Sequence, residues 1–204
     1  MGRTDVSVAG PLTSGSNSLD FTQQRNDGGT FTSNLFAGTY SVSSTGRMIY
    51  TPTTGSASVF YLVNTNQAFS LIGNGGVNSG FFESQSGSPF STSSASGTYA
   101  LGPIDPENLN GADSVGVATF TPATNGLSSI DDGNQSGGSP GVNQVQSLTY
   151  SVDSTGLGMS PSGCSISATS TTCRMLFYII SPTKAALINI NPNSTTPKLY
   201  LLDQ

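Results

Sequence analysis

Histidine and tryptophan are both absent from this sequence, and only 8% of its 204 residues carry a charge. Without histidine the chain cannot assemble a Ser-His-Asp or Cys-His catalytic group. Six basic residues against eleven acidic ones give a net charge of −5. Nucleic-acid-binding domains normally carry a clustered basic surface, and juxtamembrane lipid-binding segments are polybasic. We therefore expect no nucleic-acid partner.

Long apolar runs are also missing. The longest, residues 175–180, has the length of a β-strand, whereas a membrane-spanning helix needs roughly 20 apolar residues. We therefore predict no membrane span. No signal peptide is visible, because polar sequence follows Met1 almost directly. The surface is rich in hydroxyl and amide side chains, which favours an extracellular or cell-surface location with the export signal removed over a cytoplasmic one.

Only two cysteines are present, Cys164 and Cys173, with eight residues between them. They do not form the CxxC pattern of a zinc site. The pair is either redox-active or a structural disulfide that closes a hairpin loop. A Ser/Thr/Gly-rich segment between two apolar runs favours the structural disulfide, which agrees with an oxidising, extracellular compartment. We predict no cofactor.

Glycine and proline are abundant, with 25 and 11 copies. Between them run short segments such as Thr-Tyr-Ser-Val at 39–42, whose period of two is typical of a half-buried strand. Turn sequences such as Asn-Asp-Gly-Gly at 26–29 separate these segments. Apolar residues seldom recur at helical spacing. We predict an all-β protein with essentially no helix, built from two tandem, related antiparallel modules of barrel or sandwich type.

One stretch of sequence occurs in both halves. Residues 38–46 read Gly-Thr-Tyr-Ser-Val-Ser-Ser-Thr-Gly, and residues 148–156 read Leu-Thr-Tyr-Ser-Val-Asp-Ser-Thr-Gly. Phe-Tyr-Leu-Val at 60–63 matches Phe-Tyr-Ile-Ile at 177–180. The offset grows between the two matches, and the additional residues fall in the cysteine-bearing segment. The residues expected to support the repeated strands and turns are Tyr40, Val42, Gly46, Phe60 and Tyr61 in the first copy, and Tyr150, Val152, Gly156, Phe177 and Tyr178 in the second.

The repeat divides the chain into a first module, residues 1–86, a Ser/Gly-rich linker, residues 87–96, and a second module, residues 97–204. The second module opens with Gly-Thr-Tyr-Ala-Leu at 97–101, and the first module has no counterpart of this strand. Either the sequence belongs to a longer array, or a neighbouring subunit supplies the strand. An unpaired edge can accept a strand from another chain. We predict copies of the same protein as the partner.

These motifs resemble a tandem repeat of about 110 residues in secreted and surface proteins of acidobacteria and related soil bacteria. Its pattern runs Gly-x-Tyr-x-Val, a Gly-Arg turn, Phe-Tyr-Leu-Val-Ser with a following Lys-Ala, and a closing Glu-x-Gln. In the second copy, Leu157 stands in place of the Arg, and Asp203 precedes the last Gln. The resemblance implies an exported, β-rich module and carries no catalytic residues. The first copy matches at 38–42, 46–47, 60–63 and 83–85.

Two short motifs resemble catalytic sequences. Ser181-Pro182-Thr183-Lys184 matches the Ser-x-x-Lys nucleophile motif, which requires a helix start, but it lies in a predicted turn. Asp153 begins Asp-Ser-Thr-Gly, which resembles the Asp-Thr-Gly of aspartic proteases. A shared-proton pair needs two carboxylates, and the first half has Ser43 at this position. Both motifs are interpreted as turns, so we predict no enzyme activity.

A weak metal candidate lies in the polar loop after residue 101. A hard cation such as calcium takes six to eight oxygen ligands, and this loop supplies several carboxylate and amide oxygens. Their order does not match an EF-hand, so a solvated loop is the preferred interpretation and no metal is predicted. The four candidate residues are Asp105, Glu107, Asn110 and Asp113.

Composition and repeat together favour a non-enzymatic, extracellular structural or adhesive module, with a self-assembling filament or surface-layer subunit as one form of it. The alternative is a lipocalin-like barrel that binds a small apolar molecule. The interior distinguishes the two, because packed side chains favour a structural role, whereas an open apolar cavity favours ligand binding.

Overall fold

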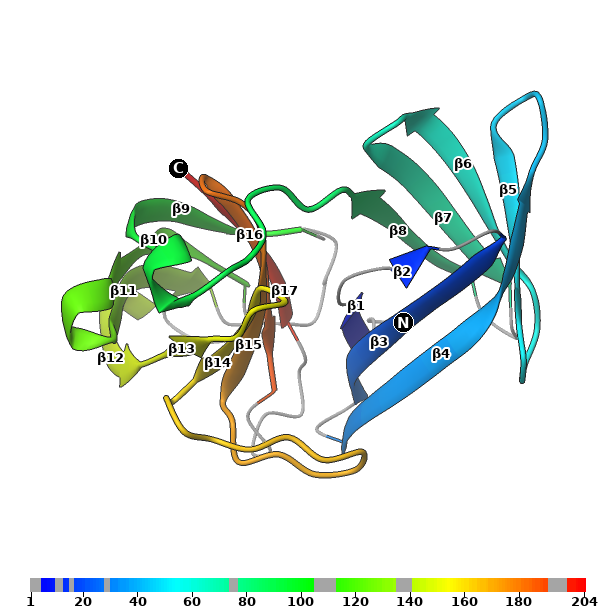
Figure 1. Ribbon diagram of the computed structural model, residues 1–204. Coiled ribbons are helices and arrows are strands. Elements are labelled where there is room, and N and C mark those ends of the chain that lie inside the picture. Colours follow the sequence, from blue (N-terminus) through cyan, green and yellow to red (C-terminus); the bar gives the residue numbers. More distant parts are fainter. Residues whose placement is uncertain are drawn as a thin grey trace.

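The computed structural model confirms the prediction of an all-β protein. Two curled antiparallel sheets, one from each half of the chain, lie side by side (Figure 1). Within the described residues, the helical elements are two short 3-10 turns, η1 (Thr92–Ser94) and η2 (Pro122–Thr124). The structure describes residues 5–9, 13–14, 17–27, 30–73, 77–104, 113–134, 141–190 and 198–204.

The first sheet is a series of hairpins in which neighbouring strands mostly follow one another along the chain. The short strand β2 (Thr13–Ser14) pairs with β3 on the same side as β1. The path of the sheet runs β1 (Asp5–Ala9), β3 (Ser18–Asp27), β4 (Thr30–Val42), β5 (Arg47–Pro52), β6 (Ser58–Asn64), β7 (Gln67–Gly73) and β8 (Val77–Glu83).

The second sheet curls until its two ends meet. Its path runs β12 (Gly141–Thr149), β11 (Gly126–Asn134), β10 (Asp113–Thr121), β9 (Gly97–Pro103), β17 (Lys198–Asp203), β16 (Lys184–Asn189), β15 (Met175–Ser181), β14 (Leu157–Ser160) and β13 (Ser151–Val152). The first and last strands of this path, β12 and β13, are consecutive in the chain and separated only by Tyr150. One bent strand therefore contributes to both ends of the sheet.

Strands of the two sheets pair in corresponding registers. Ser41 pairs with Ile49 and Ser151 with Met159, at the same offset as the sequence match. The hairpins β6–β7 and β15–β16 also correspond, including an irregularity in the ladder before each turn. Strands β4 to β8 thus correspond to β12–β13, β14, β15, β16 and β17, and β3 corresponds to β11.

Strand β15 is apolar along most of its length because both of its faces are buried. Successive side chains of a strand point to opposite faces. Phe177 and Ile179 lie in the cluster inside the second sheet, and Leu176 and Tyr178 lie in a cluster on its outer face. That outer cluster includes Phe31 of the first sheet. The outer cluster thus joins the two halves of the protein.

The inner cluster of the second sheet is built around Phe120. The ring of Phe120 lies 5.1 Å from that of Tyr150, 5.2 Å from that of Phe177 and 5.5 Å from that of Tyr99, all in edge-to-face arrangements. Such aromatic pairs each add roughly 0.5–1.5 kcal/mol to the free energy of area burial. The centre of the second sheet is therefore filled by side chains.

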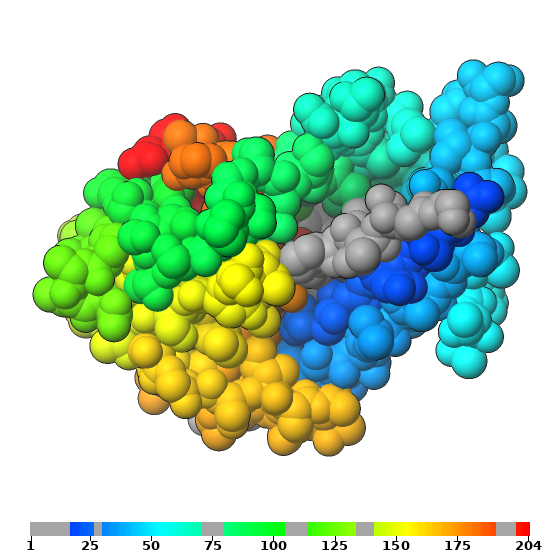
Figure 2. Space-filling view, in the orientation of Figure 1, coloured from blue at the N-terminus to red at the C-terminus, as the bar shows by residue number. Residues whose placement is uncertain are grey.

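The predicted disulfide between Cys164 and Cys173 is present. It closes the loop between β14 and β15, which is longer than the corresponding loop between β5 and β6. The loop reaches the first sheet, where the backbone amide of Ser33 donates to the carbonyl of Ala168 at 2.8 Å. In the space-filling view this loop lies against the strands of the first half (Figure 2).

Removing the disulfide should destabilise the protein by about 2–3 kcal/mol, because the unfolded chain gains the entropy of an open loop of this length. The paired substitution Cys164→Ser and Cys173→Ser, followed by denaturant unfolding, measures this loss. Because Cys173 is fully buried, its replacement by Ser also changes the packing. Reduction of the unsubstituted protein opens the disulfide without changing a side chain and is therefore the control. An unchanged unfolding free energy in both experiments would contradict the assignment.

Candidate functional site: an open sheet edge and exposed outer faces

Tyr150 closes the second sheet and holds the segment that joins the halves. Its side chain is fully buried. Its hydroxyl hydrogen is shared between the carbonyl of Ala95, at 2.7 Å, and that of Thr92, at 3.1 Å, and its backbone amide donates to the carbonyl of Asn125. Burial, with a smaller contribution from Tyr99, raises the pKa of Tyr150 to about 12. The predicted linker is thus fastened to the bend at Tyr150.

Strand β9 is the element that completes the second sheet. It pairs with β10 on one side and with β17 on the other. Tyr99, in the middle of β9, points into the inner cluster beside Phe120, and its hydroxyl donates to the carbonyl of Pro182 at 2.9 Å. Both the backbone and the core of the second sheet therefore depend on β9.

The first sheet has no equivalent of β9 in the part of the chain that the structure describes. Strands β1 and β2 pair with β3 as β10 pairs with β11, and β8 corresponds to β17. Between β1 and β8 there is no described strand, and the path of the sheet ends at these two strands. This is the position at which the sequence shows no counterpart, in the first module, of the strand at residues 97–101.

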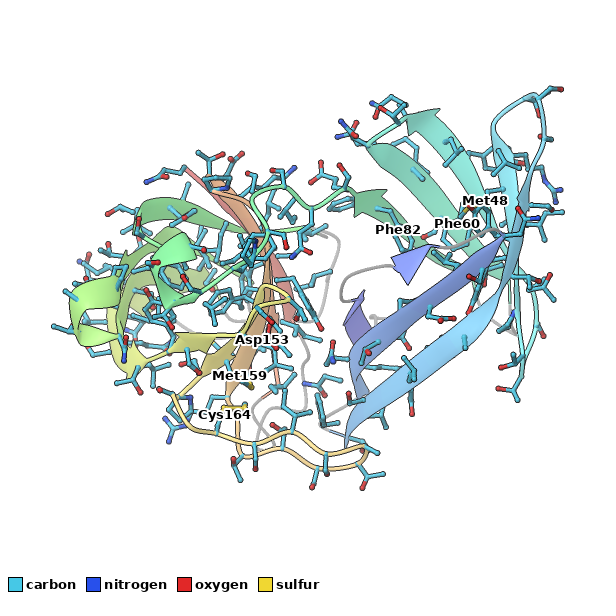
Figure 3. The ribbon with its side chains drawn as sticks, in the orientation of Figure 1. Met48, Phe60, Phe82, Asp153, Met159 and Cys164 are labelled. Atoms are coloured by element: carbon cyan, nitrogen blue, oxygen red, sulfur yellow. A yellow bond between two sulfur atoms is a disulfide. The ribbon has the colours of Figure 1, made fainter. Side chains whose placement is uncertain are left out.

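The inner face of the first sheet is correspondingly less covered. Met48, Phe60 and Phe82 gather on this face (Figure 3), and Phe60 is buried there. Leu62, however, is 41% exposed, whereas Ile179 at the corresponding position is 2% exposed. Tyr50 is buried on the same face, and its hydroxyl finds no hydrogen-bond partner among the described residues. The inner face of the first sheet thus leaves apolar surface at Leu62 exposed, unlike the corresponding place in the second sheet.

The outer face of β3 and β4 packs against the outer face of β15 and β16. The hydroxyl of Tyr178 donates to Oε1 of Gln24 at 2.8 Å, and Nδ2 of Asn26 donates to the carbonyl of Asn189 at 2.9 Å. Gln24 and Asn26 are both buried, so these hydrogen bonds satisfy groups that have lost water. Burial is the main cause that raises the pKa of Tyr178, and the hydrogen bond to Gln24 opposes it.

A second group of contacts fastens the end of β8 to β15 and β16. Lys184 Nζ lies 2.7 Å from Oε2 and 2.8 Å from Oε1 of Glu83, in a partly buried ion pair. Nε2 of Gln85 donates to the carbonyl of Ile179 at 2.6 Å and to that of Thr155 at 3.0 Å. Polar contacts thus join the halves on both sides of the outer cluster.

Two rows of apolar side chains remain exposed on the outer faces. Tyr61, Phe69 and Phe81 are cross-strand neighbours on β6, β7 and β8, with exposed fractions of 50%, 61% and 39%. We call them the aromatic row. Val117, Ile130 and Val145 are cross-strand neighbours on β10, β11 and β12, with exposed fractions of 43%, 46% and 67%. We call them the aliphatic row.

The two motifs that resemble catalytic sequences form turns. Oδ1 of Asp153 accepts from the amides of Thr155 and Leu157 and from the Thr155 hydroxyl. Gly156 in this turn has a φ of +86°, and Gly46 in the corresponding turn has +78°, a region that favours glycine. The amide of Thr183 donates to the Ser181 hydroxyl within its own turn, while Lys184 forms the ion pair with Glu83.

The weak calcium candidates cannot be placed together. Asp105, Glu107 and Asn110 lie outside the described residues, and Asp113 begins β10 with its side chain undescribed. Over the described ranges, no cluster of three or more His, Cys, Asp or Glu residues could hold a metal ion. None of the helices described is long and apolar enough to cross a membrane.

The ten residues predicted to support the repeat occupy corresponding strands and turns, but their burial differs between the halves. Tyr178 is 6% exposed and Tyr61 is 50% exposed. The sequence analysis did not identify Gln24, Asn26 and Phe31, which form the contact between the sheets. Comparison with known protein families, with curated proteins and with solved structures finds no match for this chain.

Raising the pH above about 10 should destabilise the protein. A buried tyrosine whose pKa is raised to about 12 keeps its proton in the folded state, while the unfolded state loses its proton near pH 10. Stability is therefore retained below pH 10 and falls as the pH rises towards 12. Unfolding free energies between pH 8 and 11.5 measure the slope, and Tyr150→Phe should reduce it. An identical slope in that variant would refute this role of Tyr150.

Tyr178 and Gln24 should be energetically coupled. Tyr178→Phe leaves the buried Gln24 oxygen without its donor, and Gln24→Leu leaves the Tyr178 hydroxyl without its acceptor, so each single change should cost about 1–3 kcal/mol. The double variant should cost less than the sum of the two, by about 1 kcal/mol. Denaturant unfolding of the four proteins gives the coupling, and additive losses would contradict the contact.

Proposed function

We propose that this protein is a non-enzymatic, extracellular module with a structural or adhesive role, and that its first sheet is completed by a β-strand from another chain. We treat the two sheets as two copies of one module, and within the described residues the first copy has no counterpart of β9. The observation that carries the proposal is that the path of the first sheet ends at β1 and β8, with no described strand at the place that β9 occupies in the second sheet. Unpaired sheet edges present rows of backbone donors and acceptors and readily add a strand.

The second sheet supplies the template for the strand that fits. Residues 97–101 read Gly-Thr-Tyr-Ala-Leu, with Tyr99 buried and its neighbours Thr98 and Ala100 exposed. An incoming strand would place a large apolar side chain over the inner face of the first sheet, next to the half-exposed Leu62. Backbone pairing provides affinity in such complexes, and the alternate side chains provide specificity.

A disulfide, together with a surface that carries little charge, supports the extracellular setting. The non-enzymatic part of the proposal is supported by the two motifs that resemble catalytic sequences. Asp153 accepts three hydrogen bonds within its turn, and Lys184 is held by Glu83. Both side chains thus have structural partners.

The interior of the second sheet favours the structural role over the lipocalin-like alternative. Aromatic rings around Phe120 fill its centre. A cavity of about 150 Å³ remains beside them, whereas pockets for drug-sized ligands measure roughly 300–1,000 Å³. Its lining mixes apolar and polar side chains, among them Leu127, Leu187, Ser114, Asp131, Gln146 and Arg174.

A synthetic peptide with the sequence of residues 97–103 tests the strand proposal. We expect saturable binding to the protein, measured by fluorescence anisotropy, together with a rise in its melting temperature. The same peptide with Ala in place of its tyrosine should bind about tenfold or more weakly, because the apolar anchor is lost. A scrambled peptide of identical composition serves as control. Equal binding of all three peptides, or of none, would refute strand addition.

Two protein variants locate the peptide. Leu62→Glu places a charge on the inner face of β6 and should weaken binding about tenfold or more. Tyr61→Glu is its matched control, because Tyr61 is the preceding residue on the same strand, pairs regularly with Phe69, is 50% exposed and points to the outer face. The two variants should therefore differ in peptide affinity but not in fold, as judged by circular dichroism.

A further inference from the structure

We propose that copies of this protein stack head to tail, with the aliphatic row of one copy seated on the aromatic row of the next. The inference rests on the proposed structural role and names its partner and surface. It does not depend on strand addition, because it uses the outer faces of the sheets and not the ends of the first sheet at β1 and β8.

The contact between the two sheets within one chain is the template. There, the outer face of β3 and β4 presents Gln24 to Tyr178 on the outer face of β15. Tyr61 occupies the position of Tyr178 in the first sheet, since Phe60 pairs with Met48 as Phe177 pairs with Gly158. Tyr178 is covered by the other half of the chain, whereas Tyr61 is half exposed. The outer face around Tyr178 therefore has a counterpart around Tyr61. The first of these two faces is covered within the chain, and the second is exposed.

The outer face of β3 and β4, which carries Gln24, also has a counterpart, on β11 and β12. Thr22 pairs with Leu35 on β3 and β4, and Ile130 pairs with Val145 at the corresponding place on β11 and β12. Asp132 follows Ile130 by two residues as Gln24 follows Thr22, and Asp132 pairs with Val115 on β10 as Gln24 pairs with Val8 on β1, so Asp132 corresponds to Gln24. In the first sheet, the part of this face around Gln24, Asn26 and Phe31 packs against the second sheet, whereas Leu35 is 74% exposed. In the second sheet the corresponding face carries the exposed aliphatic row and Asp132, which is also exposed.

The two uncovered faces match in chemistry. One is aromatic and the other aliphatic, and contiguous exposed apolar patches on a soluble protein mark interaction sites. Arg47 is the cross-strand neighbour of Tyr61, so it lies beside the aromatic row. Asp132 lies beside the aliphatic row, two residues after Ile130 on the same face. In the stacked arrangement Asp132 takes the place of Gln24, accepts from the Tyr61 hydroxyl and faces Arg47.

The geometry leads to an open array. The strands that carry the two rows lie at opposite ends of the molecule, with β10 to β12 at the left of Figure 1 and β6 and β7 at the right. The two faces differ from each other, so the contact is heterologous and leaves one free face at each end of every dimer. Heterologous contacts of this kind give filaments when the rotation between copies does not close a ring.

Charge exchange tests the stacking. Sedimentation velocity of the full chain over a range of concentrations should show a mass that rises with concentration. Arg47→Glu sets two carboxylates against each other, and Asp132→Lys sets two cations against each other, so each variant should stay monomeric at concentrations where the parent assembles. The double variant, and an equimolar mixture of the two single variants, should assemble again, because opposite charges meet at every contact.

Two further variants separate this inference from strand addition. Tyr61→Ser should weaken stacking about tenfold or more and leave peptide binding unchanged. Leu62→Ser, the neighbouring residue on the inner face, should leave stacking unchanged. A parent protein that remains monomeric at every concentration, single charge variants that assemble like the parent, or a double variant that fails to recover would each overturn head-to-tail stacking. Peptide binding to a monomeric protein would leave the strand proposal intact and refute stacking alone.

Discussion

Pairing of the sheet edges is the constraint on which the rest of the structure depends. Backbone donors and acceptors at an edge must find partners or remain exposed to water and to other chains. In the second sheet, β9 pairs on both sides, and the bend at Tyr150 brings β12 and β13 to the two ends of the path. The buried hydroxyl of Tyr150 holds η1 against this bend. The closed arrangement thus results from one extra strand and one bent strand.

The same constraint explains why the two sheets associate as they do. Strand β15 is buried on both faces, and its outer face lies in a cluster that includes a residue of the first sheet. The first sheet provides this cover with Gln24, Asn26 and Phe31. The polar members of this set are buried at little net cost, because each donates to or accepts from a group of the second sheet. Association of the halves is therefore part of the folding of the second sheet.

The all-β class, the turns at Gly46 and Gly156 and the disulfide could be predicted from the sequence, because each is encoded locally by alternation, by glycine or by a cysteine pair. The burial of Gln24 could not, since its partner Tyr178 is 154 residues away. Likewise, Phe-Tyr at 60–61 and at 177–178 is the same local sequence, yet Tyr61 is half exposed and Tyr178 is buried. The neighbouring sheet, and not the strand itself, decides this difference.

Scarcity of charge gives single ionic groups unusual weight on this surface. With only six basic residues in 204, a face that carries an arginine is distinguished from most others of the molecule. Arg47 lies beside the aromatic row, and Leu157 occupies the corresponding place in the covered face of the second sheet. Gln24 in the covered contact likewise corresponds to Asp132 on the exposed outer face of the second sheet. Two neutral residues on the covered faces, Gln24 and Leu157, thus correspond to two opposite charges on the exposed faces. In the proposed stacking, the apolar rows would contribute buried area but little orientational specificity. The opposite charges of Arg47 and Asp132 would determine which two faces associate.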